Sequence, residues 1–147
     1  MGTVRNILQA KGHAVYSIHP DNTVYEALMV LVERNVGALL VVDDQDKFLG
    51  VFSERDYARK VILKGRASKE TLIREIMTER PITVTENESI EDCMVKMTDK
   101  RIRHLPVTDE QQRLVGLISI GDVVKFIIDE QRYIINNLEC YINGTHT

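Results

Sequence analysis

Hydrophobic positions recur along this chain with two different spacings, and each spacing predicts one kind of element. Val24, Ala27, Leu28 and Leu31 follow the three- and four-residue spacing that places side chains on one face of a helix. Short uninterrupted apolar runs, such as residues 36–42, are typical of buried strands. In the first half, these patterns predict a helix at 4–11, a strand at 15–18, a helix at 24–35, a hairpin of strands at 36–42 and 48–52, and a helix at 53–63.

The second half of the chain repeats this pattern at a constant offset of 66 residues. Gly50–Asp56 returns as Gly116–Asp122, and both segments have the form Gly-x-x-Ser-x-x-Asp. The opening helix returns at residues 73–77 with an offset of 69. The repeat predicts a strand at Ile82–Val84, a helix after Ser89, strands at 105–107 and 114–119, and a last helix that Gly144 ends. The chain is therefore two β-α-β-β-α units, each preceded by a short helix, around a shared α/β (α+β) core.

Two features of the second unit depart from the repeat. Pro106 lies inside a predicted strand and cannot donate a ladder hydrogen bond, so this strand should be an edge there or expose its backbone. The last helix is longer than its counterpart and carries apolar residues without an obvious partner, such as Ile127, Ile135, Leu138 and Ile142. This surplus apolar face predicts a homodimer.

Composition and charge narrow the classes of function. With 147 residues the chain can build one sizeable core, and its net charge of -3 argues against a general nucleic-acid binder. Its longest apolar run, at residues 36–42, is far shorter than the roughly 20 residues of a membrane helix. The first residues lack the apolar segment of an export signal, and Cys93 and Cys140 lack metal-site or redox spacing. We therefore expect a cytoplasmic protein without membrane or nucleic-acid partners.

The duplicated units resemble a pair of CBS domains, the arrangement called a Bateman module. The resemblance rests on the two Gly-x-x-Ser-x-x-Asp segments, on the run from Gly50 to Tyr57 and on the run from Arg101 to Val107. It extends over about residues 1–143, with 1–68 as the first repeat and 69–143 as the second. The chain looks most like small stand-alone bacterial members of the family, and we therefore expect no attached catalytic domain.

The resemblance implies a ligand and a way of holding its ribose. CBS pairs bind AMP, ADP, ATP, NAD-type dinucleotides or S-adenosylmethionine in clefts between their units, and AMP is the ligand that we expect first. The ribose-binding aspartate of the family corresponds to Asp56 and Asp122, and its hydroxyl-bearing partner corresponds to Ser53 and Ser119. A carboxylate suits this role because it can accept hydrogen bonds from both ribose hydroxyls. No cofactor is required.

The phosphate-binding positions implied by the resemblance differ between the units. In some members, basic residues before the hairpin contact phosphate, and they correspond to Arg103 and His104. The first unit has Gly37 and Ala38 there, so the clefts are not equivalent, although Arg55 could supply charge. We therefore expect Asp122, Ser119, Arg103 and His104 to hold the tighter ligand together. The full candidate set is Gly37, Ala38, Ser53, Arg55, Asp56, Thr83, Arg103, His104, Ser119 and Asp122.

Simpler interpretations of these residues stay open. Ser-x-x-Asp is also an acidic variant of the capping box that begins many helices, and His104 is also compatible with a purely structural role. The basic residues Arg59, Lys60, Lys100 and Arg101 are compatible with solvated helix surfaces.

The sequence therefore predicts a non-enzymatic regulatory module that senses an adenine nucleotide, with an unidentified regulated protein as a further partner. The alternative is a constitutive interaction module whose clefts stay empty and whose dimer surface is the function. An enzyme has little support, because no paired base and nucleophile, Gly-rich phosphate loop or metal-ligand cluster stands out.

Overall fold

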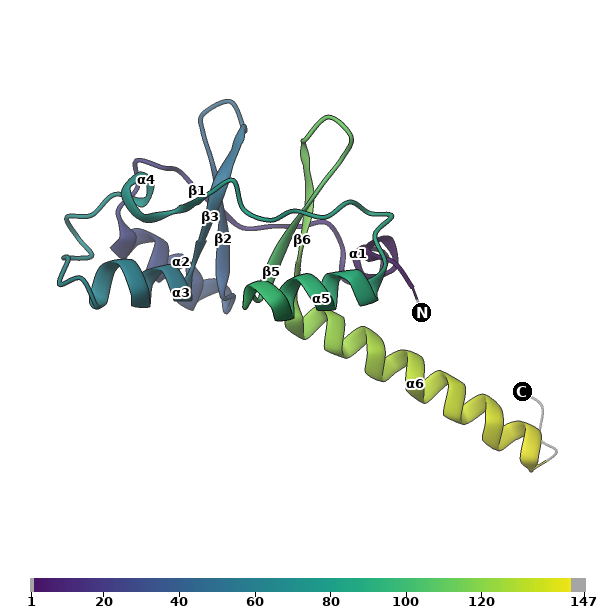
Figure 1. Ribbon diagram of the computed structural model, residues 1–147. Coiled ribbons are helices and arrows are strands. Elements are labelled where there is room, and N and C mark those ends of the chain that lie inside the picture. The colour runs from purple at the N-terminus through teal and green to yellow at the C-terminus, as the bar shows by residue number, and fades with distance from the viewer. Residues whose placement is uncertain (1, 144–147) are drawn as a thin grey trace.

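The computed structural model describes residues 2–143 and contains two β-hairpins that lie side by side (Figure 1). The helices and strands follow one another in the order α1 (Val4–Lys11), β1 (Ser17–Ile18), α2 (Val24–Arg34), β2 (Ala38–Val42), β3 (Phe48–Ser53), α3 (Glu54–Asp56), η1 (Tyr57–Ile62), α4 (Ile73–Ile76), β4 (Thr78–Glu79), α5 (Ile90–Lys100), β5 (His104–Thr108), β6 (Leu114–Ser119) and α6 (Ile120–Ile142). This mixed α/β architecture confirms the predicted fold class.

The two hairpins have the same register, as the repeat predicts. Ala38 lies opposite Ser53 in the first hairpin, and His104 lies opposite Ser119 in the second. Both hairpins also shift register at the same place, next to Val41 and next to Val107. The first hairpin belongs to a sheet of order β1-β2-β3-β4, whereas β5 and β6 form a sheet of their own.

Pro106 explains why the second sheet lacks a counterpart of β1. In the first repeat, the backbone N–H of Leu40 donates to the carbonyl of Tyr16 at 3.0 Å, which helps to hold β1 beside β2. Pro106 stands at the position equivalent to Leu40 and has no N–H to donate. The strand predicted at Ile82–Val84 is therefore reduced to one isolated bridge between Val84 and Val107, and the strand prediction was wrong in extent.

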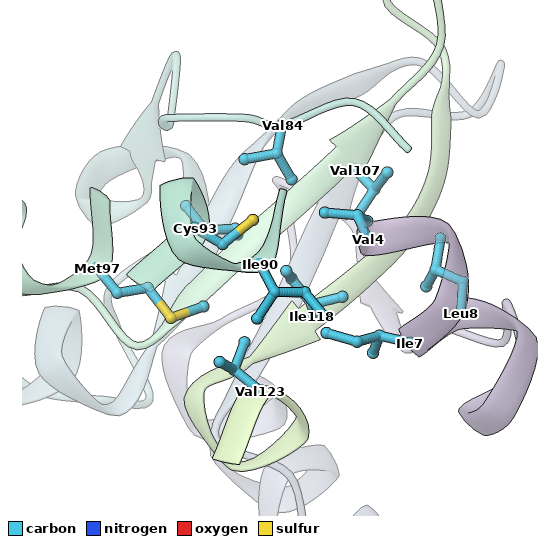
Figure 2. Close-up of a cluster of buried hydrophobic side chains, with 11 residues drawn as sticks. Val4, Ile7, Leu8, Val84, Ile90, Cys93, Met97, Val107, Ile118 and Val123 are labelled. Carbon is cyan, nitrogen blue, oxygen red and sulfur yellow. The ribbon is translucent and has the colours of Figure 1, made fainter. Parts of the chain in front are cut away.

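The short opening helices cross over to the opposite repeat. Val4, Ile7 and Leu8 of α1 are buried in the core of the second repeat, where Figure 2 shows them beside Ile118. In turn, Ile73 and Ile76 of α4 are buried in the core of the first repeat. Each core therefore depends on the other half of the chain, and the two units share one folded body.

The helix after β3 is less regular than predicted. Residues 53–63 were expected to form one ordinary helix, but after the short α3 the chain continues as the π-helix η1. A π-turn often lies at a functional site, because its extra residue changes the direction in which side chains point.

The equivalent helix of the second repeat, α6, is regular and extends away from the rest of the molecule (Figure 1). Apolar side chains of its outer part are exposed, including Leu138 at 56% and Ile142 at 77%. The predicted end at Gly144 lies outside the described residues.

Candidate functional site

A cavity lies at the seam between the two repeats. Its volume is about 820 Å³, within the range of roughly 300–1,000 Å³ that is typical of small-molecule sites. Five segments line it: the residue before β2, the end of β3 with α3 and η1, the chain around β4, the end of α5, and the start of β5. The lining residues are Gly37, Val51, Ser53, Glu54, Arg55, Asp56, Arg59, Lys60, Thr78, Arg80, Pro81, Ile82, Lys100, Arg101, Ile102, Arg103 and His104.

Asp56 is the buried carboxylate of this cavity, with only 6% of its surface exposed. One of its oxygens accepts from the backbone N–H and the hydroxyl of Ser53, at 2.9 and 3.1 Å. The other accepts from the hydroxyl of Thr78 at 2.8 Å and lies 3.1 Å from the ammonium of Lys60. These four donors occupy the roughly four lone-pair sites of a carboxylate, so a ligand must displace one of them to bind Asp56.

The Ser53–Asp56 pair is also a helix cap. The hydroxyl of Ser53 accepts from the backbone N–H of Asp56 at 3.3 Å while the carboxylate reaches back to Ser53. The simpler interpretation of this motif is therefore present in the structure. It does not exclude a ligand role, because the same carboxylate lines the cavity.

Positive charge is concentrated around the cavity, although the whole chain has a net charge of -3. Only two lining residues, Glu54 and Asp56, are acidic. Seven lining residues are basic, namely Arg55, Arg59, Lys60, Arg80, Lys100, Arg101 and Arg103. A cleft lined by one sign of charge focuses the field and attracts ligands of the opposite sign. This lining therefore favours an anionic ligand.

The side chain of His104 contributes little positive charge to the cavity. Burial lowers the pKa of His104 below its ordinary value, and the charges of Lys11 and Arg103 act in the same direction against the opposing effect of Asp122. Its ring packs close to Gly37, where an added Cβ would lie 3.2 Å from the ring carbon Cε1. A neutral imidazole at this place can donate or accept one hydrogen bond per nitrogen.

The candidate residues that line the cavity together are not the group that the sequence predicted. Six of the ten candidates line it, namely Gly37, Ser53, Arg55, Asp56, Arg103 and His104. The basic start of β5 thus shares this space with the Ser-x-x-Asp segment of the first repeat, whereas we expected it to act with Ser119 and Asp122. Among the other candidates, Ala38 is buried, Thr83 is partly buried, and neither belongs to the lining.

Several lining residues were not predicted as site residues. Lys100 and Arg101 fitted a solvated helix end, and Arg59 and Lys60 fitted a basic helix surface. Thr78 and Arg80 lie in or beside β4, a two-residue strand that no apolar pattern predicts. Only the tertiary arrangement shows that these polar segments converge on one space.

Asp122, the equivalent aspartate of the second repeat, has different partners. Its oxygen Oδ2 accepts from the ammonium of Lys11 at 2.7 Å and from the backbone N–H of Ser119 at 2.8 Å. Burial tends to raise the pKa of Asp122. The hydrogen bonds from Lys11 and Ser119 together outweigh this effect, so the pKa of Asp122 is lowered. A cavity of only about 90 Å³ borders this carboxylate.

Comparison with known proteins identifies the same architecture elsewhere. The sequence profile of the CBS domain matches the chain twice, at residues 4–63 and 73–129. A protein with CBS domains from Burkholderia ambifaria is 48% identical, with a TM-score of 0.83 over 88% of this chain and 96% of that one. The mitochondrial CBS domain-containing protein CBSX3 of Arabidopsis thaliana is 40% identical over 97% of this chain and 72% of its own length.

One similar structure contains a nucleotide. The structure of CBSX2 in complex with AMP is 28% identical to this chain, with a TM-score of 0.71 over 89% of this chain and 99% of that one. Within residues 2–143, no helix is both long and apolar enough to cross a membrane.

Proposed function

Because this chain belongs to the CBS domain family as a tandem pair, we propose that it is a non-enzymatic regulatory module that binds an adenosine-containing anion in the cavity at the seam. The observation that carries the proposal is the cavity of about 820 Å³ with seven basic residues around a buried aspartate. AMP is the first candidate ligand, and the complex of the similar protein CBSX2 with AMP supports it. ADP and ATP carry more negative charge than AMP, and NAD-type dinucleotides carry two phosphate groups, so we keep all three as candidates for the same lining.

The ribose of the ligand has a route to Asp56. Of the four donors on this carboxylate, the ammonium of Lys60 belongs to a long side chain that is 42% exposed, and it also donates to the carbonyl of Ile76 at 3.1 Å. One ribose hydroxyl replaces Lys60 on the carboxylate, and the released ammonium turns toward the phosphate of the same ligand. Ligand binding then exchanges one ion pair for another, which limits the electrostatic cost.

The phosphate is held by the basic residues of the second repeat. Arg103 is the central candidate, because a guanidinium can bind phosphate oxygens with two parallel hydrogen bonds. The ligand therefore contacts the first repeat through its ribose and the second through its phosphate. A ligand that bridges the repeats in this way stabilises one relative position of the two halves, which is how the module would report its presence.

The experiment that tests this proposal is calorimetric titration of AMP and adenosine into the parent and Arg103→Ala. A charged hydrogen bond contributes roughly 1.5–3 kcal/mol, so the variant should bind AMP about ten- to a hundredfold more weakly and adenosine almost unchanged. Arg113→Ala is the matched control, because Arg113 is 73% exposed at the tip of the second hairpin. If the parent binds neither ligand, or Arg103→Ala binds AMP like the parent, the proposed function is wrong.

The alternative function, a constitutive interaction module, is supported by one separate observation. Large apolar side chains are exposed on helices of both repeats or directly after them, for example Val32 at 81%, Leu63 at 76% and Val95 at 56%. Exposed apolar surface of this kind marks protein–protein interfaces. We propose that it is covered in a homodimer, which is compatible with ligand binding and becomes the main function only if the cavity stays empty.

A further inference from the structure

The outer half of α6 lies outside both CBS repeats and does not pack against the rest of the described chain. The profile of the CBS domain ends at residue 129, whereas α6 continues to Ile142. Every residue from 131 to 139 is exposed, whichever side of the helix it occupies. Most of the stability of a helix in a protein comes from packing of its apolar face, so this segment calls for a partner.

The apolar residues of α6 follow the seven-residue repeat of a coiled coil. Six positions along the helix are separated alternately by four and three residues, as the inward-facing positions of a coiled coil are. They form what we call the α6 stripe: Val124, Ile128, Gln131, Ile135, Leu138 and Ile142. Its five apolar members are all exposed. The stripe is therefore one side of an interface between two helices.

The two flanks of the α6 stripe differ in character. On one flank, the residues that directly precede stripe positions 128, 135 and 142 are apolar, namely Ile127, Ile134 and Tyr141. On the other flank, the residues that directly follow stripe positions 124, 131 and 138 are charged, namely Lys125, Arg132 and Glu139. In coiled coils these flanking positions select the partner and its direction, because they meet across the interface.

The flanks favour a second α6 that runs in the opposite direction. An antiparallel pair places like flanks together, so with Val124 opposite Ile142 of the second copy, Lys125 lies opposite Glu139 of the second copy. Two-fold symmetry makes this ion pair twice, and it brings the two apolar flanks together. A parallel pair would instead set each apolar flank against a charged one and would pair no opposite charges.

Two polar residues near the centre of the antiparallel pair work against its stability. Arg132 lies opposite its own copy at the symmetry axis, where its long side chain can extend into water. Gln131 is the polar member of the α6 stripe. A polar residue among apolar ones lowers the stability of a coiled coil but selects one register, because other registers bury it less favourably.

We propose that α6 pairs antiparallel with α6 of a second copy of this chain through the α6 stripe. The inference deepens the homodimer proposed above and is independent of nucleotide binding. In Figure 1, α6 leaves the body on the side of α2 and α5, away from the hairpin loops, so one second copy can cover these helices as well. A membrane surface fits less well, because residues 129–143 contain one arginine and three acidic residues.

The first test measures the dissociation constant of the homodimer by sedimentation equilibrium of the full chain. Leu138→Glu places a charge in the stripe of both copies and should weaken the dimer at least about a hundredfold, since a buried leucine is lost twice. Asn136→Glu is the matched control, because it adds the same charge to the same turn at a position outside the stripe and its flanks. It should leave the dissociation constant unchanged.

The second test determines the direction of the pair by exchanging charges. Lys125→Glu and Glu139→Lys should each weaken the dimer about tenfold, and the double variant should return to within about threefold of the parent. The two residues are about 21 Å apart along one helix, so only contact between copies can produce this rescue. The double variant also keeps the net charge of the parent.

Three results would overturn the inference. They are a monomeric parent, a Leu138→Glu variant that dimerises like the parent, and a double variant that is as weak as either single variant. The last result would show that the helices do not pair antiparallel in this register. Failure of the proposed nucleotide binding is seen separately, because AMP titration reports on the cavity at the seam and none of the substituted residues lines that cavity.

Discussion

Replacing Asp56 by asparagine separates its role as a helix cap from its role in ligand binding. An asparagine oxygen placed where one carboxylate oxygen lies still accepts from the backbone and hydroxyl of Ser53, at the positions now 2.9 and 3.1 Å away. Its amide then faces Thr78 and can donate to that hydroxyl. The cap survives, and the principal loss is the ion pair with the partly exposed Lys60, which contributes about 0–1 kcal/mol.

The expected magnitudes for stability and for binding therefore differ. The free energy of unfolding of Asp56→Asn should fall by about 1 kcal/mol or less, as urea denaturation would show. AMP and adenosine should both bind about ten- to a hundredfold more weakly, because an amide donor replaces one acceptor of the ribose hydroxyls. Asp56→Ala removes the cap as well and should lose about 1–3 kcal/mol of stability.

The control and the contradicting result follow from the same geometry. Asp109 accepts backbone hydrogen bonds from Gln111 and Arg113 in the turn of the second hairpin, so Asp109→Asn changes the same charge at a place that does not line the cavity. It should bind AMP like the parent. If Asp56→Asn also binds AMP within about twofold of the parent while its stability is preserved, Asp56 is only a cap, and its assignment to ribose is wrong.

Two further predictions concern pH and assembly. Burial lowers the pKa of His104, so the unfolded chain binds more protons than the folded chain below the unfolded pKa of roughly 6.5. The free energy of unfolding should therefore fall as pH decreases through that region. Urea denaturation at several pH values should show this fall in the parent and a flatter profile in His104→Gln. Light scattering at micromolar concentration should give twice the chain mass of 16.8 kDa for the parent. Val32→Glu should reduce the measured mass without lowering the melting temperature. A monomeric parent would contradict the dimer.

The sequence predicts the hairpins and caps well because their causes are local. Thr23 accepts from the backbone of Glu26 at 3.1 Å and Ser119 accepts from that of Asp122 at 3.1 Å, as the capping spacing requires. The apolar runs of both hairpins are long enough to identify four strands. Their common register follows from the repeat itself, since strands with corresponding patterns and turns of equal length pair in the same way.

The cavity could not be predicted as completely, because polar segments without periodicity build much of it. Arg80 lies just beyond β4, and Arg101 adopts a left-handed backbone conformation at the end of α5, with φ of 53°. Neither local pattern indicates which other segment these side chains face. Their convergence depends on how the two repeats pack against each other. A sequence pattern within one repeat does not predict that packing.

The exchange of opening helices links the fold to the difference between the two sites. Because α1 packs in the core of the second repeat, its last residue Lys11 reaches Asp122. Because α4 packs in the core of the first repeat, the chain that follows it forms β4 and brings Thr78 to Asp56. The two aspartates are equivalent in sequence, yet Asp56 receives the hydroxyl of a paired strand beside the ammonium of Lys60, whereas Asp122 receives the ammonium of Lys11 from the end of a helix. A duplicated chain with two Ser-x-x-Asp segments thus gives its two aspartates different surroundings through the segments that precede its repeats.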